Sequence, residues 1–263
     1  MGDYCEGKVH GKGLYSWVNG ESYDGEWYQG LKHGYGVWKG NNGDQYIGQW
    51  HKNRAHGYGV HEWQNGDKYE GEWKFCLRHG QGCDQFANGD VYLGEYNYGK
   101  ANGYGQYRWA NGNTYSGTFF DGMKVGKGIW KKSGSEQNTN TYEGEYLDDK
   151  KHGFGEFKWA SGGYYRGNYS NDVKTNYGEM YWQDGSIYRG NWHKGIQNGL
   201  GIMIFANGIR KAGIFQDNVL VELLMDKNDI ERMERQSGLE FPEAFRQELK
   251  EYLGLMNPDE NNS

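Results

Sequence analysis

No run of about 20 apolar residues occurs in the 263-residue sequence, which excludes a transmembrane helix of ordinary length. The polar start, MGDYCEGKVH, leads us to expect no secretory signal. Cysteines are also few: Cys5, Cys76 and Cys83 are odd in number and form no CxxC pair. This pattern is typical of reduced thiols in the cytosol rather than of a disulfide or zinc framework.

Aliphatic residues are scarce, and glycine and aromatic residues replace them. The chain contains 45 Gly, 23 Tyr and 11 Trp, although only 35% of its residues are apolar. Glycine makes up about 7% of an average protein, which is less than half of its share here. Each aromatic ring can bury about 150–250 Å², so we expect rings to form the core.

The net charge of −6 is concentrated at the C-terminal end. Residues 217–263 hold 12 acidic and 5 basic residues, whereas residues 1–216 hold 23 acidic and 24 basic ones. A nearly neutral body offers no electrostatic case for binding nucleic acid or anionic lipid.

The sequence is built on a repeat of 23 residues that begins with tyrosine. A glycine follows each tyrosine by two positions, and a further aromatic residue follows it by four. A Gly-x-Gly pair, such as Gly34 and Gly36, stands in the second half of each repeat except one, where Asn176 precedes Gly178. The register shifts once, where the polar stretch KKSGSEQNTNT at 131–141 adds four residues. We interpret this stretch as a lengthened loop; a partner contact or a local bend is the alternative.

The tyrosine, the glycine and the second aromatic residue stand at every other position, and this period of two predicts strands. Asn-Gly recurs before most new tyrosines, as at Asn19-Gly20, with Ser161-Gly162 and Asp184-Gly185 as variants, and is a strong hairpin signal. Each repeat is therefore expected to form two antiparallel strands, roughly Tyr23–Tyr28 and Tyr35–Lys39 in the first. Because side chains two apart share a face, the rings should cover the neighbouring glycines.

The opposite face of the strands should carry the residues between the rings. We interpret them as a solvated face, with a charged docking surface as the alternative. They are Asp24, Glu26, Glu70, Glu72, Glu95, Glu143, Glu145, Arg166 and Arg189.

The pattern changes after Phe215 to one that predicts helices. Residues 219–236 and 243–255 have helical spacing, Pro242 fits a first turn and Gly254 fits a helix end. One expected apolar stripe contains Phe241, Phe245, Leu249, Tyr252 and Leu253, and another contains Val219, Leu220, Leu223 and Leu224. We expect these helices to cap the last repeat, with a docking or dimer contact as the alternative, and NPDENNS at 257–263 to be disordered.

No catalytic or cofactor site is indicated. The P-loop, HExxH and GxSxG motifs and a GxGxxG after a strand are absent, and no carboxylate pair is peculiar to one repeat. The 47 residues from position 217 onward are expected to hold no catalytic domain. Successive copies of a recurring histidine should lie about 10 Å apart, too far to share a metal ion, and we expect them in loops. They are His10, His33, His56, His79 and His152.

The motif YDGEW…G…HGYG…NG resembles the MORN repeat (membrane occupation and recognition nexus), over about residues 2–217. The resemblance implies a mainly β fold: an elongated, single-layer antiparallel meander of about nine repeats over residues 1–217. A short acidic helical extension would occupy residues 218–263. It also implies a groove that binds partner peptides or helices. We expect the groove to be lined by Tyr23, Trp27, Tyr46, Trp50, Tyr69, Trp73, Tyr92, Tyr96, Tyr115, Tyr142, Tyr165, Tyr188 and Trp192.

The function implied by the resemblance is that of a non-catalytic scaffold without metal or cofactor. A stand-alone array with no attached enzyme is similar to ciliary or flagellar scaffolds, such as those of the radial spoke head. Its expected partners are other proteins of a large cytoskeletal assembly, and its expected location is the cytoplasm and the axoneme; self-association is possible. The alternative is a membrane-associated adaptor that binds phosphoinositides.

Overall fold

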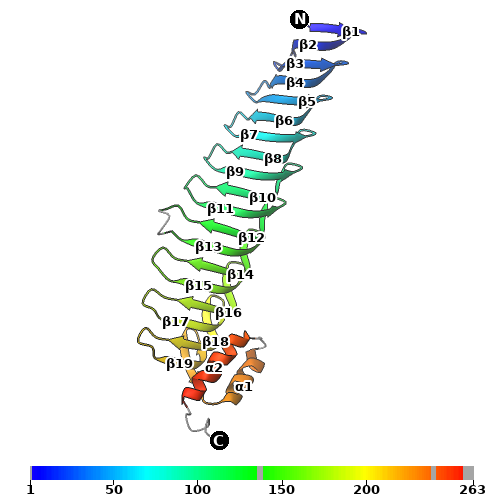
Figure 1. The fold of residues 1–263 in the computed structure, drawn as a ribbon. Coiled ribbons are helices and arrows are strands. Elements are labelled where there is room, and N and C mark those ends of the chain that lie inside the picture. The colour runs from blue at the N-terminus through cyan, green and yellow to red at the C-terminus, as the bar shows by residue number, and fades with distance from the viewer. Residues whose placement is uncertain (1, 135–138, 238–240, 257–263) are drawn as a thin grey trace. The chain divides into compact units, whose positions relative to one another are not determined.

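The structure is a computed structural model that describes residues 2–134, 139–237 and 241–256. It is mainly β. Twenty strands form one open antiparallel sheet in the order of a meander, and two helices follow them (Figure 1). The expected β-meander with a short helical C-terminal part is therefore confirmed. Contacts divide the chain into two compact units, with the boundary between Val125 and Gly126.

In the first unit each strand pairs with the next one along the chain, and the glycines of neighbouring strands face each other, as Gly25 and Gly36 do. The second strand of a repeat begins at Leu31, four residues earlier than the expected Tyr35. The strands are β1 (Gly2–Cys5), β2 (Lys8–Ser16), β3 (Ser22–Tyr28), β4 (Leu31–Lys39), β5 (Gln45–His51), β6 (Arg54–Glu62), β7 (Lys68–Lys74), β8 (Leu77–Gln85), β9 (Val91–Asn97), β10 (Lys100–Arg108) and β11 (Thr114–Phe120).

The second unit continues the same pattern of pairing and ends in helices. The loop expected at 131–141 lies between two of its strands; Lys132 N donates a hydrogen bond to Asn140 O at 2.9 Å, and residues 135–138 lie outside the described residues. The elements are β12 (Met123–Lys131), which begins in the first unit, β13 (Thr141–Leu147), β14 (Lys150–Lys158), β15 (Tyr164–Ser170), β16 (Val173–Tyr181), β17 (Ile187–His193), β18 (Ile196–Ile204), β19 (Arg210–Gln216), β20 (Val219–Leu223), α1 (Lys227–Ser237) and α2 (Glu243–Met256).

The turns are of two kinds, and Asn-Gly marks only one of them. Within a repeat the chain reverses over two residues that both have positive φ, such as Lys52 (48°) and Asn53 (66°), which is the geometry of a type I′ hairpin. Between repeats the loop is longer. Gly20 N donates to Trp17 O at 3.0 Å, and only the glycine of the Asn-Gly pair has positive φ. Asn-Gly therefore marks the loops between repeats, and the tight two-residue turns lie within the repeats.

The core consists of tyrosine rings laid over paired glycines, as expected. A Cβ atom on Gly59 would lie 2.3 Å from the Tyr46 hydroxyl oxygen, and one on Gly48 would lie 2.8 Å from it. The ring of Tyr46 also meets Trp50 edge to face at 4.9 Å and Trp73 of the next repeat at 5.4 Å. Because these contacts recur from repeat to repeat within each unit, neighbouring repeats of a unit share a row of rings.

The tyrosine core predicts sensitivity to alkali. Burial raises the pKa of the core tyrosines, such as Tyr23, Tyr69 and Tyr165, above its ordinary value of about 10. Above that pH the unfolded chain releases phenolic protons that the folded chain retains, so the free energy of unfolding falls as pH rises. We expect the sheet to unfold above about pH 10, with tyrosinate absorbance and loss of the β circular dichroism signal appearing together. Reversible titration of the tyrosines with an unchanged spectrum would contradict this.

The residues after Phe215 form a further strand before the helices begin, so the helix expected from Val219 onward was wrong there. β20 pairs with β19, Leu220 opposite Phe215, after a two-residue turn at Asp217 and Asn218 in which both φ values are positive. This turn continues the hairpin geometry of the repeats, and the exposed edge of the sheet favours pairing over helix formation. Val219 and Leu223 are consequently exposed.

The two helices pack on one face of the last strands rather than on the edge of the sheet (Figure 1). α2 begins after Pro242, as expected, but continues through Gly254, which does not end it. Residues 257–263 lie outside the described residues. The helices bury a cluster that contains the expected stripe of α2. Its members are Leu200, Ile202, Ala212, Leu224, Ile230, Phe241, Phe245, Leu249, Tyr252 and Leu253.

Candidate protein-interaction surface

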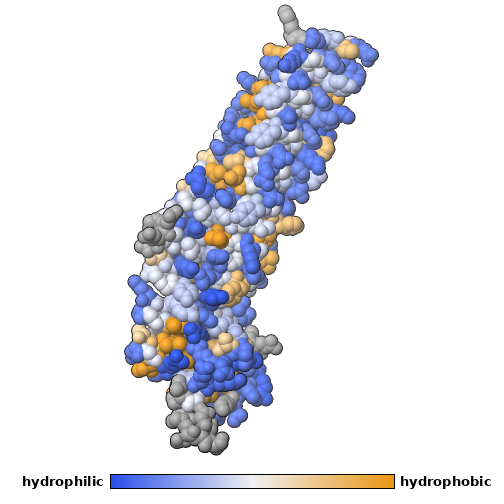
Figure 2. Space-filling view, in the orientation of Figure 1, coloured by the Kyte–Doolittle hydropathy of each residue, from blue (hydrophilic) through white to orange (hydrophobic). Residues whose placement is uncertain are grey.

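The sheet has two faces of different character. We call the side with the core rings the aromatic face, and the side that carries the residues between them, such as Asp24 and Glu26, the second face. Figure 2 shows apolar patches separated by polar residues on the side of the molecule that it presents. The two faces offer a partner different chemistry.

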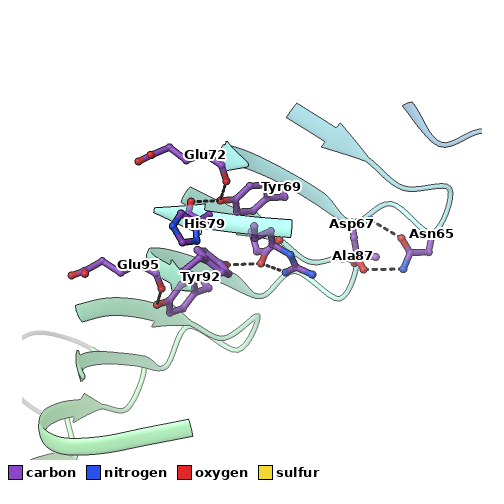
Figure 3. A network of polar contacts seen from close by, with 11 residues as sticks. Asn65, Asp67, Tyr69, Glu72, His79, Ala87, Tyr92 and Glu95 are labelled. Carbon is purple, nitrogen blue, oxygen red and sulfur yellow. Dashed lines mark hydrogen bonds and ion pairs between the residues drawn. The ribbon is translucent and has the colours of Figure 1, made fainter. Parts of the chain in front are cut away.

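The thirteen side chains expected to line a groove are all on the aromatic face and are all buried. Their exposed fractions lie between 0% for Tyr23 and 8% for Trp50. Their rings contact other rings of the core, and the tyrosine hydroxyls form hydrogen bonds within the sheet. In Figure 3 the hydroxyls of Tyr69 and Tyr92 donate to the carbonyls of Glu72 and Glu95, at 2.9 and 3.1 Å. The structure thus gives these residues a packing role, and their contact with a partner stays a prediction.

Basic side chains lie over the rings of the aromatic face, which the sequence reasoning missed. Lys32 Nζ lies 4.3 Å from the ring centroid of Trp50, and Lys174 Nζ lies 4.6 Å from that of Trp192. Burial lowers the pKa of Lys174 to about 8. The signal was a basic residue nine positions after the tyrosine, found at Lys32, Arg78, Lys124, Lys151 and Lys174.

One buried polar cluster is peculiar to a single repeat. Asp84 forms an ion pair with Arg78 and accepts a hydrogen bond of 2.5 Å from the Tyr96 hydroxyl. Burial raises the pKa of the Asp84 carboxyl. Both neighbours bind the same carboxylate oxygen, and the side chain of Asp84 is 5% exposed. We interpret the cluster as an internal contact that replaces a ring of the core.

The recurring histidines lie in strands, so their expected place in loops was wrong. His33 and His56, from β4 and β6, flank His51 of β5, with ring centroids 5.2 and 5.8 Å from that of His51. These rings line a hollow of ≈ 430 Å³ together with Tyr35 and Gln49. Among residues 2–134, 139–237 and 241–256, no group of three or more His, Cys, Asp or Glu is arranged to hold a metal ion.

The second face carries exposed aromatic residues at the centre of the Gly-x-Gly pairs. Tyr35, Tyr58, Tyr104 and Phe154 are between 47% and 57% exposed. The equivalent residue near the C-terminal end, Tyr177, packs instead against α2, with its ring 5.1 Å from that of Phe245. The sequence reasoning named the charged residues of this face and missed these rings, although their place between two glycines was a visible signal.

Contacts between the second face and α2 include an ion pair. Arg189 Nη1 lies 2.7 Å from Glu248 Oε1 of α2, and Arg189 also lies 3.9 Å from Glu179. The second face thus binds an acidic amphipathic helix at one end, and its rings are exposed in earlier repeats.

Within the described part of the chain, no helix is long and apolar enough to cross a membrane.

Two solved structures are loosely similar to the chain. The TCP domain of SAS-4 from Drosophila melanogaster, in complex with a proline-rich motif of Ana2, is 16% identical with a TM-score of 0.38. That match covers 60% of this chain and 84% of the domain. A mutant TCP10 domain of Danio rerio CPAP is 11% identical with a TM-score of 0.28, over 79% of this chain and 96% of the domain. At these scores neither likeness supports a function.

Comparison with family models gives a stronger result. None of the curated proteins compared with the chain matches it. The model of the MORN repeat matches nine segments, namely residues 1–22, 23–45, 46–68, 69–91, 92–114, 115–135, 142–164, 165–187 and 188–210. The chain therefore belongs to the MORN repeat family, whose repeats form a non-enzymatic scaffold for interactions.

Proposed function

We propose that the chain is a non-catalytic scaffold of a microtubule-based structure, with an axonemal assembly such as the radial spoke head as the specific site. Its partners would be peptides or helices of other proteins in that assembly, and its location the cytoplasm and the axoneme of a cilium or flagellum. The observation that carries the scaffold role is the second face: its own α2 covers Tyr177 and Leu200, and the equivalent rings Tyr35, Tyr58 and Tyr104 are exposed. Exposed aromatic side chains on a rigid sheet are suited to protein recognition.

Fractionation of a ciliated cell tests the proposed location. We expect the chain to remain with the demembranated axoneme after detergent extraction and to leave it only in high salt or chaotrope. Complete recovery in the soluble cytosol would contradict an axonemal role. Recovery with another insoluble cytoskeletal fraction would support the scaffold role but assign it to a different assembly.

A membrane-associated adaptor is the second candidate, and the basic side chains of the aromatic face favour it. Lys32, Lys151 and Lys174 could approach phosphate groups, but each lies over aromatic rings and is already partly buried. We expect little binding to vesicles of phosphatidylcholine with a small fraction of phosphoinositide at physiological salt. Sedimentation with the vesicles measures this, and pure phosphatidylcholine is the control. Strong binding that salt abolishes would favour the adaptor over the scaffold.

A further inference from the structure

α2 shows which ligand the second face accepts. Phe245 and Leu249 of α2 lie in one buried cluster with Leu200, Ile202 and Ala212 of the sheet. The Cα positions of Ile202 and Ala212 face each other across β18 and β19, so these side chains form a row across the strands. A helix of three turns is about 16 Å long and spans three to four strands that are about 4.8 Å apart. The second face thus binds an amphipathic helix by an apolar row that crosses its strands.

The same row exists in the first unit, where none of the described helices covers it. Val37 faces Ile47 and Ile47 faces Val60 across β4, β5 and β6, at the repeat positions that Ile202 and Ala212 occupy in the last strands. The exposed rings of Tyr35 and Tyr58 stand beside this row, at the position of Leu200. The first unit therefore carries an apolar row of the kind that α2 covers in the second.

The charges beside the two rows are opposite in sign. In the second unit Arg189 stands next to the apolar row and pairs with Glu248 of α2. In the first unit the equivalent position holds Asp24 and Glu70 at the two ends of the row, where they face Val37 and Val60. Glu26 and Glu72 lie on the same face, where one oxygen of each accepts a backbone N–H, from Tyr35 and Gln81. A helix that binds there needs basic flanks, and the acidic α2 of a second copy does not supply them.

We infer that the second face of β3–β9 binds an amphipathic helix of another protein, with an apolar stripe like that of α2 and with lysine or arginine beside the stripe. This inference rests on the proposed scaffold function and adds the chemistry of the partner. Four basic side chains at strand ends lie on the same face, namely Lys39, Arg54, Lys68 and Lys74; Lys68 is 3.8 Å from Glu62, and Arg54 and Lys74 lie over the rings of Phe75 and Tyr98. The acidic side chains flank the apolar row itself, so they determine the preferred sign.

Peptides based on α2 test the inference on the full chain. One peptide has the sequence of residues 241–254, a second carries E243K, E248K and E251K, and a third is a scrambled form of the second. We expect the basic amphipathic peptide to bind with 1:1 stoichiometry in fluorescence anisotropy, at least tenfold more tightly than the other two, and to weaken with salt. Equal binding of the basic and scrambled peptides would show charge attraction alone and overturn the inference. Equal or tighter binding of the native acidic peptide would also overturn it and would point to a second copy as the occupant.

Two variants locate the binding site. Tyr58→Ala is expected to lower the affinity for the basic peptide at least tenfold. Phe154→Ala, at the same repeat position beside Arg166, should leave that affinity unchanged. Both side chains are exposed, so thermal melts should match the parent and exclude misfolding. Equal effects of the two variants would overturn the assignment to the first unit. If the chain fractionates with the axoneme but binds no basic peptide, the helix assignment fails and the scaffold function stands.

Discussion

Replacing Trp73 by alanine is expected to lower the free energy of unfolding by about 3–5 kcal/mol, as truncation of large buried aromatics does. The side chain is 6% exposed. Its ring meets Tyr69 at 5.0 Å and Tyr46 of the preceding repeat at 5.4 Å, and its Nε1 donates to Gly59 O at 3.0 Å. The substitution therefore removes a ring contact between neighbouring repeats and leaves a buried carbonyl without its donor. Nearest-neighbour contacts of this kind hold a repeat array together.

Urea denaturation followed by circular dichroism measures the loss. Tyr58→Ala is the matched control, because that ring is 54% exposed on the opposite face, and its effect should stay within about 0.5 kcal/mol. A loss below about 1 kcal/mol for Trp73→Ala would show that the ring does not hold the repeats together.

Removal of residues 225–263 is expected to make the chain aggregate and its last strands fray. The deletion keeps β20 but strips both helices from the second face of β18 and β19. Leu200, Ile202 and Ala212, each 1% exposed or less, would then face water. Exposed contiguous apolar surface of this kind promotes association.

Light scattering and a thermal melt of the truncated chain measure both effects. Glu248→Ala is the control for loss of the ion pair alone; it should remain monomeric and melt nearly as the parent, because Arg189 keeps Glu179 and Tyr181 as partners. A truncated chain that scatters no light and melts unchanged would show that the helices serve a partner rather than the array.

The spacing of Tyr, Gly and Trp was sufficient to predict the hairpins, since only a strand places residues two apart on one face. The strand at Val219–Leu223 was not predictable in the same way, because VLVELL fits a helical stripe as well as an edge strand. The pairing with β19 decides between them. The turn at Phe75 and Cys76 was also missed, because neither residue is a usual turn former and the sheet register imposes the positive φ values.

The candidate site was predicted less well than the fold. The periodic rings suggested a groove. A ring that covers glycine, such as Tyr46 over Gly59, is buried in the core, so it offers little surface to a partner. The exposed rings of the second face are less regular, because Lys12, Gln81, Lys127 and Leu200 replace them in four repeats. The sequence period is clearest at positions where core packing requires the same residue type in every repeat. Binding residues that vary between repeats are therefore harder to find from one sequence.

Photocrosslinking in a ciliated cell tests most directly that proteins bind the second face of this scaffold. The full chain would carry benzoylphenylalanine in place of Tyr58 on that face or, as the control, in place of Val18, which is fully exposed in a loop between repeats. The account predicts discrete protein adducts in the axonemal fraction from position 58, and few or none from position 18. Adducts with lipid alone, or the same adducts from both positions, would contradict it.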